Sequence, residues 1–119
     1  MDSDRITFMP WDGPTYGLYS DENYLVFRWI GKGTILASVS RRGDAACAHL
    51  YSDKIGLRGL KQAINEFVEF ALWLFDWCKM VLAQITKPSI ERVVRKCGFN
   101  YVGEDAKGIK VYERSVWVA

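Results

Sequence analysis

The sequence predicts one α/β domain, in which two helices pack on a mixed and mostly antiparallel sheet. Three observations predict this fold. The first part of the chain contains short runs of β-branched and aromatic residues separated by turn residues. An apolar stripe with helical spacing then covers residues 56–77. After it, strand-like and helix-like segments alternate. The length of 119 residues fits a single domain, residues 1–119.

Four strands are expected in the first half of the chain. Residues 10–23, between the first two strands, are rich in Gly, Pro, Asp and Tyr and are expected to form a loop. Turn residues at Gly31-Lys32-Gly33 and Gly43-Asp44 join the last three strands into a meander. The expected strands are Arg5–Met9, Tyr24–Ile30, Thr34–Ser40 and Ala45–Tyr51.

The second half begins with a long amphipathic helix, expected from Gly56 to Trp77. An apolar strand, Met80–Ile85, follows it. A second helix is expected to begin at Pro88, where a missing N–H costs nothing, and to end at Gly98. Two strands, Asn100–Val102 and Ile109–Arg114, complete the chain. Because a full helix precedes Met80–Ile85, this strand is expected to run parallel to a strand of the meander.

Composition and charge argue against several classes of protein. The net charge is +2 and no long run of one sign occurs, so we do not expect the protein to bind nucleic acid. Three widely spaced cysteines and one histidine predict no metal site and instead buried free thiols. The N-terminal residues have no apolar signal segment, and the apolar stretch 67–74 is too short to span a bilayer. We therefore expect a cytoplasmic protein without a membrane partner.

The segment Lys87–Glu104, KPSIERVVRKCGFNYVGE, carries the most specific motif of the chain. An apolar helix that ends in Lys96, Gly98 and Phe99 and leads into a closing hairpin resembles the GCN5-related N-acetyltransferase (GNAT) superfamily. The order of elements over residues 24–114 is similar to that of the family. The resemblance implies that Met80–Ile85 lies parallel to Ala45–Tyr51, with acetyl-coenzyme A entering where these two strands splay apart.

The resemblance also implies where a cofactor would bind. Family members carry an Arg/Gln-x-x-Gly-x-Gly/Ala turn before the long helix, whose N–H groups hold the pyrophosphate. The corresponding residues here are Arg58, Gly59 and Ala63, with Lys61 in place of the central glycine. Lys54, Arg58 and Lys61 form a basic cluster at this helix start. The cluster is either an anion site or an ordinary solvated helix start.

Several positions that carry catalytic residues in the family hold other residues in this sequence. Val94 stands where a general-acid Tyr is frequent, and Lys87 replaces an Asn. No acidic residue lies in Ala45–Tyr51, so His49 is the candidate general base, although a lone strand histidine is more often structural. Small degenerate proteins of this fold occur in tailed bacteriophages as internal virion proteins, and the compressed chain resembles them.

Two classes of function therefore stay open. The first is transfer of an acetyl group from acetyl-coenzyme A to an amine. The second is a non-catalytic protein of the same fold that binds a virion or host protein. Phe70, Trp73 and Trp77 lie on the shoulder of the expected long helix, as either a wide core face or the interface with a protein partner or a second copy.

Overall fold

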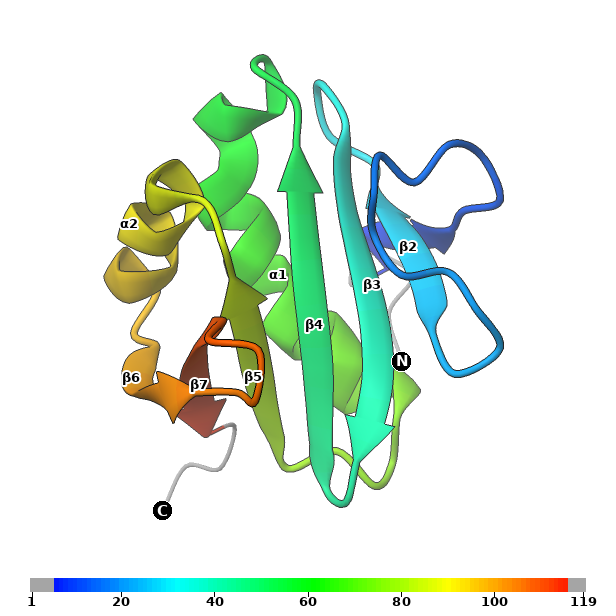
Figure 1. Ribbon diagram of the computed structural model, residues 1–119. Helices are drawn as coiled ribbons and strands as arrows, with labels where there is room; N and C mark the ends of the chain where they lie inside the picture. The colour runs from blue at the N-terminus through cyan, green and yellow to red at the C-terminus, as the bar shows by residue number, and fades with distance from the viewer. Residues whose placement is uncertain (1–5, 116–119) are drawn as a thin grey trace.

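The computed structural model describes residues 6–115 and contains a seven-stranded sheet with two helices packed on one face (Figure 1). The strand order across the sheet is β1-β2-β3-β4-β5-β7-β6. The strands are β1 (Phe8–Pro10), β2 (Leu25–Trp29), β3 (Ile35–Arg42), β4 (Ala45–Ser52), β5 (Met80–Ile85), β6 (Asn100–Glu104) and β7 (Lys110–Ser115). The helices are α1 (Leu60–Leu74) and α2 (Pro88–Lys96), and a 3₁₀ turn, η2 (Gly56–Gly59), leads into α1.

The pairing of β4 with β5 is parallel, whereas each of the other neighbouring pairs in the sheet is antiparallel. This arrangement confirms the predicted mixed, mostly antiparallel sheet and the predicted partner of Met80–Ile85. The parallel register runs from Ala45 opposite Met80 to His49 opposite Gln84. β4 continues to Ser52 without β5 beside it, and the two strands diverge there (Figure 1).

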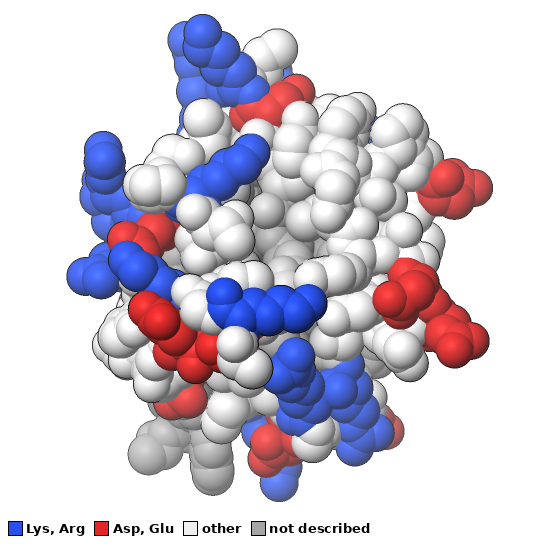
Figure 2. Space-filling model, viewed as in Figure 1, with Lys and Arg blue, Asp and Glu red and all other residues white. Residues whose placement is uncertain are grey.

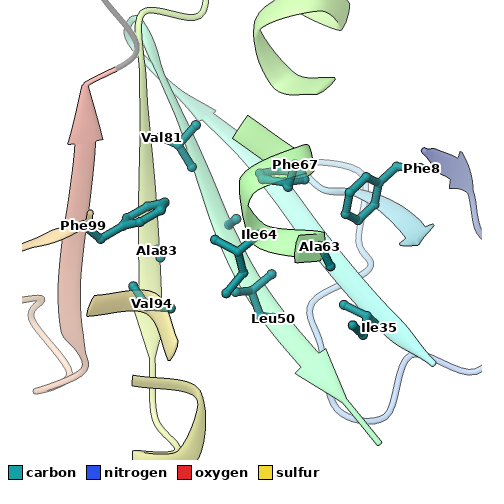
Figure 3. A pocket seen from close by; sticks show the side chains of 11 residues that line it. Phe8, Ile35, Leu50, Ala63, Ile64, Phe67, Val81, Ala83, Val94 and Phe99 are labelled. Carbon is teal, nitrogen blue, oxygen red and sulfur yellow. The ribbon is translucent and has the colours of Figure 1, made fainter. Parts of the chain in front are cut away.

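The core lies between the sheet and the two helices. Alternate residues of β3, β4 and β5 point to this face, where they meet the apolar stripes of α1 and α2. The small gap between them, about 10 Å³, has room for one water at most (Figure 3). Its lining includes Phe8, Ala63, Phe67, Val94 and Phe99. This side of the sheet is therefore packed interior, with no room for a ligand at its centre.

The second helix is as the sequence predicts. Pro88 is its first residue, and Gly98 follows it with φ of +82°, a left-handed conformation that favours glycine. The predicted long helix is wrong at both ends. Residues 56–59 form the 3₁₀ turn, and α1 stops at Leu74, so Trp77 lies in the turn that follows and has no place on a helical face.

The three aromatic residues Phe70, Trp73 and Trp77 do not lie together on one face of α1, as the sequence had led us to expect. Phe70 is buried, 3% exposed, because Phe8 from β1 and Phe27 from β2 pack on its ring at centroid distances of 5.5 and 5.1 Å. Trp77 is half-buried, with the Arg41 guanidinium 4.5 Å from its ring centroid. Trp73 alone of the three is well exposed, at 41%. Both strands, β1 and β2, were predicted from the sequence, but their packing against this part of α1 was not.

The outer strands of the sheet are short or irregular. β1 was expected at Arg5–Met9, but it ends at Pro10, and Arg5 lies outside the described residues. At the other edge, the register between β6 and β7 shifts between Tyr101 and Gly103. Both edges therefore depart from a regular hydrogen-bonding ladder.

Two further expectations concern the interior and the membrane. Cys47, Cys78 and Cys97 are all buried free thiols, as predicted. Within residues 6–115, no helix has the length and apolar character that crossing a bilayer requires.

Candidate functional site

A cavity of about 140 Å³ lies where β4 and β5 diverge. His49 and Gln84, the last paired residues of the two strands, contribute to its wall from the sheet. The start of α2 and a segment of the loop between β1 and β2 close the other sides. The lining residues are Gly17, Leu18, Tyr19, His49, Leu50, Gln84, Ile85, Thr86, Lys87 and Ile90.

His49 lies on the sheet face that faces away from the helices, as its alternation with the buried core residues Ala46 and Ala48 predicts. Its ring meets Tyr19 edge-on at a centroid distance of 5.0 Å, and Tyr24 lies at 6.0 Å. Desolvation lowers the pKa of His49, and the nearby positive charge of Arg42 lowers it further, partly offset by Asp105. The imidazole is therefore neutral near pH 7 and able to accept a proton.

The loop between β1 and β2 is fixed over this face by specific contacts. The buried hydroxyl of Ser38 donates to the Tyr19 carbonyl, and Tyr16 stacks on Tyr51 at 4.4 Å between ring centroids. The Lys107 ammonium lies 3.5 Å from the Tyr19 hydroxyl. Sequence reasoning missed Tyr19 and Lys107, because a loop has no periodicity that shows which strand it will cover.

A polar chain runs behind the cavity. The Cys47 thiol donates to Gln84 Oε1 at 3.2 Å, and Gln84 Nε2 donates to Asp105 Oδ2 at 2.8 Å. The other Asp105 oxygen accepts the backbone N–H groups of Lys107 and Ile109 at 2.8 and 3.0 Å. The Ile109 N–H is the largest influence that lowers the pKa of Asp105. The glutamine in the apolar run MVLAQI was the one sign in the sequence of these hydrogen bonds, since a buried glutamine needs polar partners. The sequence did not reveal that Asp105 is such a partner.

The expected pyrophosphate turn has a different construction from the one the resemblance implies. Lys54, Arg58 and Lys61 are exposed near the start of α1, as expected. Several backbone N–H groups here already have acceptors in the chain, namely those of Gly56, Leu57, Arg58 and Leu60. An anion at this helix start would therefore depend mainly on basic side chains, with few free N–H groups to help.

Two residues expected at the cofactor turn also have packing roles. The Ala63 side chain is 1% exposed and points into the core, so any contact of this residue with a cofactor would be made by its backbone (Figure 3). Gly59 lies against the indole of Trp29, and a Cβ at this position would come 2.7 Å from a ring carbon. Glycine is therefore required here by packing. Val94 is also buried, in the core between α2 and the sheet.

His49 and the basic cluster lie on successive elements of the chain. His49 is at the fork, the point where β4 and β5 diverge, whereas Arg58 and Lys61 are at the helix start that follows β4. The fork and the helix start are consecutive along the chain, since only residues 53–55 separate β4 from η2. No group of three residues suited to hold a metal ion occurs within residues 6–115.

Comparison with known proteins defines the class of fold. No protein-family model and no curated protein sequence matches this chain. Among solved structures, an aminoglycoside acetyltransferase in complex with coenzyme A matches with a TM-score of 0.62 and 13% identity, over 80% of this chain and 68% of that one. The Campylobacter jejuni N-acetyltransferase PseH matches with a TM-score of 0.60 and 15% identity, over 82% and 71%.

A third match has the same character. The ribosomal-protein-S5-alanine acetyltransferase from Vibrio fischeri has a TM-score of 0.61 and 15% identity, over 82% of this chain and 65% of that one. At these identities the likeness concerns the fold. The chain has the fold of the GCN5-related N-acetyltransferases, as the sequence resemblance predicted.

Proposed function

We propose that this protein transfers an acyl group from acetyl-coenzyme A to an amine at the β4–β5 fork. The observation that carries the proposal is the cavity at this fork, lined by a histidine whose environment keeps it neutral. Support for the cofactor comes from the aminoglycoside acetyltransferase of similar fold, which is a complex with coenzyme A.

The residues of the chain would divide the work as follows. His49 accepts the proton of the acceptor amine, directly or through a water, so that the nitrogen can attack. The pairing of the two parallel strands ends at His49 and Gln84, so β4 has no neighbour on the β5 side beyond this point. Lys54, Arg58 and Lys61 hold the phosphates by charge. Acetyl-coenzyme A, when bound, would supply the activated thioester: the amide C–N bond would form as the C–S bond breaks, and coenzyme A would leave as the thiol.

Two measurements test this proposal. Acetyl-coenzyme A at 100 times its Kd should stabilise the protein by about 2.7 kcal/mol, measured by thermal unfolding. Arg58→Ala should weaken binding, because it removes a cation from the helix start. Lys61→Gly should weaken it as well, because it removes a second cation at a helix start where most backbone N–H groups already have acceptors. Calorimetry that detects no heat with the wild type would exclude the cofactor.

Acetyl transfer is tested by measuring the free thiol of the coenzyme A that the reaction releases. The wild type should release coenzyme A thiol in the presence of an acceptor amine, and His49→Gln should lower kcat by about 10²-fold or more, as expected for loss of a general base. The control is Lys96→Met, which changes an exposed side chain at the far end of α2, leaves His49 and Gln84 in place, and should keep the wild-type rate. Equal rates in the wild type and His49→Gln would remove His49 from the mechanism.

A second candidate function is favoured by the occupied N–H groups at the start of α1. The protein would then be a non-catalytic member of this fold that binds a virion or host protein, and a bacteriophage origin would fit that role. The exposed Trp73 would contribute to the contact. Failure to bind acetyl-coenzyme A, together with a stable complex that Trp73→Glu abolishes, is the result expected for this candidate.

A further inference from the structure

The surroundings of the fork cavity carry an uneven distribution of charge. None of the residues that line the cavity is acidic, whereas Lys87 lies in its wall. Lys107 stands behind Tyr19 on another side, and Arg42 acts on His49 with its positive charge. In Figure 2 a hollow with uncoloured walls lies near the middle of this face, with positively charged side chains beside it; acidic side chains lie among the positive ones on the left and in a second group at the right edge.

The two lysines lie over aromatic rings beside the cavity. Lys87 Nζ is 5.8 Å from the ring centroid of Tyr51, and Lys107 Nζ is 5.8 Å from that of Tyr19. Both lysines are exposed, and neither forms an ion pair among residues 6–115. Their ammonium groups therefore keep hydrogen-bond donors free for an incoming anion.

The acidic residues near this region have partners of their own. Asp105 uses both carboxylate oxygens, on Gln84, Lys107 and Ile109. Glu91, near the start of α2, lies 3.2 Å from the Lys110 ammonium. Because no carboxylate lines the cavity within the described residues, and Asp105 offsets the charge of Arg42 at His49 only in part, a polycationic amine would meet net repulsion.

We propose that the acceptor bound at this fork is an amine that also carries an anionic group, a carboxylate or a phosphate, which Lys87 and Lys107 hold while the amine faces His49. The inference deepens the proposed function, since it names the class of amine. It rests on different residues from those that would hold the cofactor, and it can be tested without the cofactor.

The test uses the single histidine as a reporter of binding. Because His49 is the one histidine of the chain, its imidazole proton resonances are unambiguous in an NMR titration. The full chain is titrated with the C-terminal amides of glycyl-glutamate, glycyl-glutamine and glycyl-lysine. These compounds share a free amine and differ in their side chain, which is negative, neutral and positive, respectively. Phosphoethanolamine serves as the phosphate probe. We expect the glutamate compound to bind roughly five- to tenfold more tightly than the glutamine compound, as partly screened contacts with a cation would give.

Charge-removing variants identify the groups responsible. Lys87→Met and Lys107→Met should each reduce the preference for glutamate over glutamine. Lys96→Met, at the opposite end of α2, removes the same charge away from the cavity and should leave the preference unchanged. Tighter binding of phosphoethanolamine than of the glutamate compound would assign the anion as a phosphate, and the reverse order as a carboxylate.

Several results would overturn the inference. These are equal or tighter binding of the lysine compound, a glutamate preference that survives in both lysine variants, and no shift of the His49 resonances with any probe. Titration of acetyl-coenzyme A in a separate sample decides the proposed function independently. A protein that binds acetyl-coenzyme A but prefers the lysine compound retains the proposed function and loses this inference. A protein that binds the glutamate compound through Lys87 and Lys107 but ignores acetyl-coenzyme A retains the anion site alone.

Discussion

Gln84 on β5 and Asp105 in the β6–β7 turn are joined by a hydrogen bond of 2.8 Å from Nε2 to Oδ2. The pair connects the fork to the turn that carries Lys107, because the second oxygen of Asp105 accepts the N–H groups of Lys107 and Ile109. One carboxylate therefore fixes both the wall of the cavity and the shape of the turn beside it.

We predict that Asp105→Ala destabilises the protein and loosens this turn. The substitution leaves the buried Gln84 amide without its acceptor, which costs about 1–3 kcal/mol. Urea unfolding followed by tryptophan fluorescence measures the change. Asp105→Asn is the control, since it keeps an oxygen that can accept the backbone N–H groups, and it should lie between the wild type and Asp105→Ala. An unchanged midpoint in Asp105→Ala would show that the pair does not contribute to stability.

The lowered pKa of His49 predicts a pH-dependent stability. Between its folded-state pKa and the unfolded value of about 6.5, the unfolded chain binds more protons at this site than the folded chain. Stability from this group is therefore complete above pH 6.5 and is lost as pH falls toward the folded-state pKa. Unfolding free energies measured from pH 8 to pH 5 should decline less in His49→Gln than in the wild type. Arg42→Gln should reduce the slope, because it removes one cause of the shift.

Phe70 and Trp73 give a prediction that separates core from surface. Phe70→Ala should cost about 3–5 kcal/mol, because it empties a site filled by contacts with Phe8 and Phe27. Trp73→Ala, at an exposed position, should cost much less. Equal costs in urea unfolding would contradict the packing described here.

Trp73→Glu tests whether the exposed face of α1 is an interface. The variant should fold, as judged by circular dichroism, because the side chain is already 41% exposed. If the wild type self-associates in sedimentation experiments and the variant does not, Trp73 contributes to that contact. A monomeric wild type would exclude self-association through this face.

Gly33 and Gly43 provide a matched pair for a test of backbone packing. Both have positive φ, +79° and +63°, so alanine at either position costs about 1–2 kcal/mol from conformation alone. A Cβ at Gly33 would also come 2.4 Å from the Gly56 nitrogen, whereas a Cβ at Gly43 meets nothing within 4 Å. Gly33→Ala should therefore be clearly more destabilising than Gly43→Ala. Thermal unfolding of the two variants compares them, and equal melting temperatures would refute the close approach.

The elements that the sequence predicted well are those with strong local patterns. β5 and the start of α2 were predicted to the residue, because an apolar run and a proline mark them. The parallel partner of β5 was also predicted, although it depended on the family resemblance. The end of α1 was missed, because aromatic residues continue the apolar pattern to Trp77 after the helix has ended.

The candidate site was predicted only in part. His49 could be singled out as the one titratable imidazole, and its face followed from strand alternation. Tyr19 lines the cavity and Lys107 contacts Tyr19 from a loop 88 residues away in sequence, and no local pattern predicts such a contact. Ala63 was expected at the cofactor turn from its motif position, and its side chain is buried in the core, which the motif alone did not reveal.

The two outer strands have a consequence for how copies of this chain can meet. An exposed, regular edge strand would offer a template on which another chain could add a strand and begin to aggregate. β1 is three residues long and ends in Pro10, which has no N–H to donate, and the bulge at Tyr101 and Gly103 interrupts β6. Continuation of the sheet into a second molecule is therefore disfavoured at both edges, and any ordered assembly of this protein would form through side-chain surfaces.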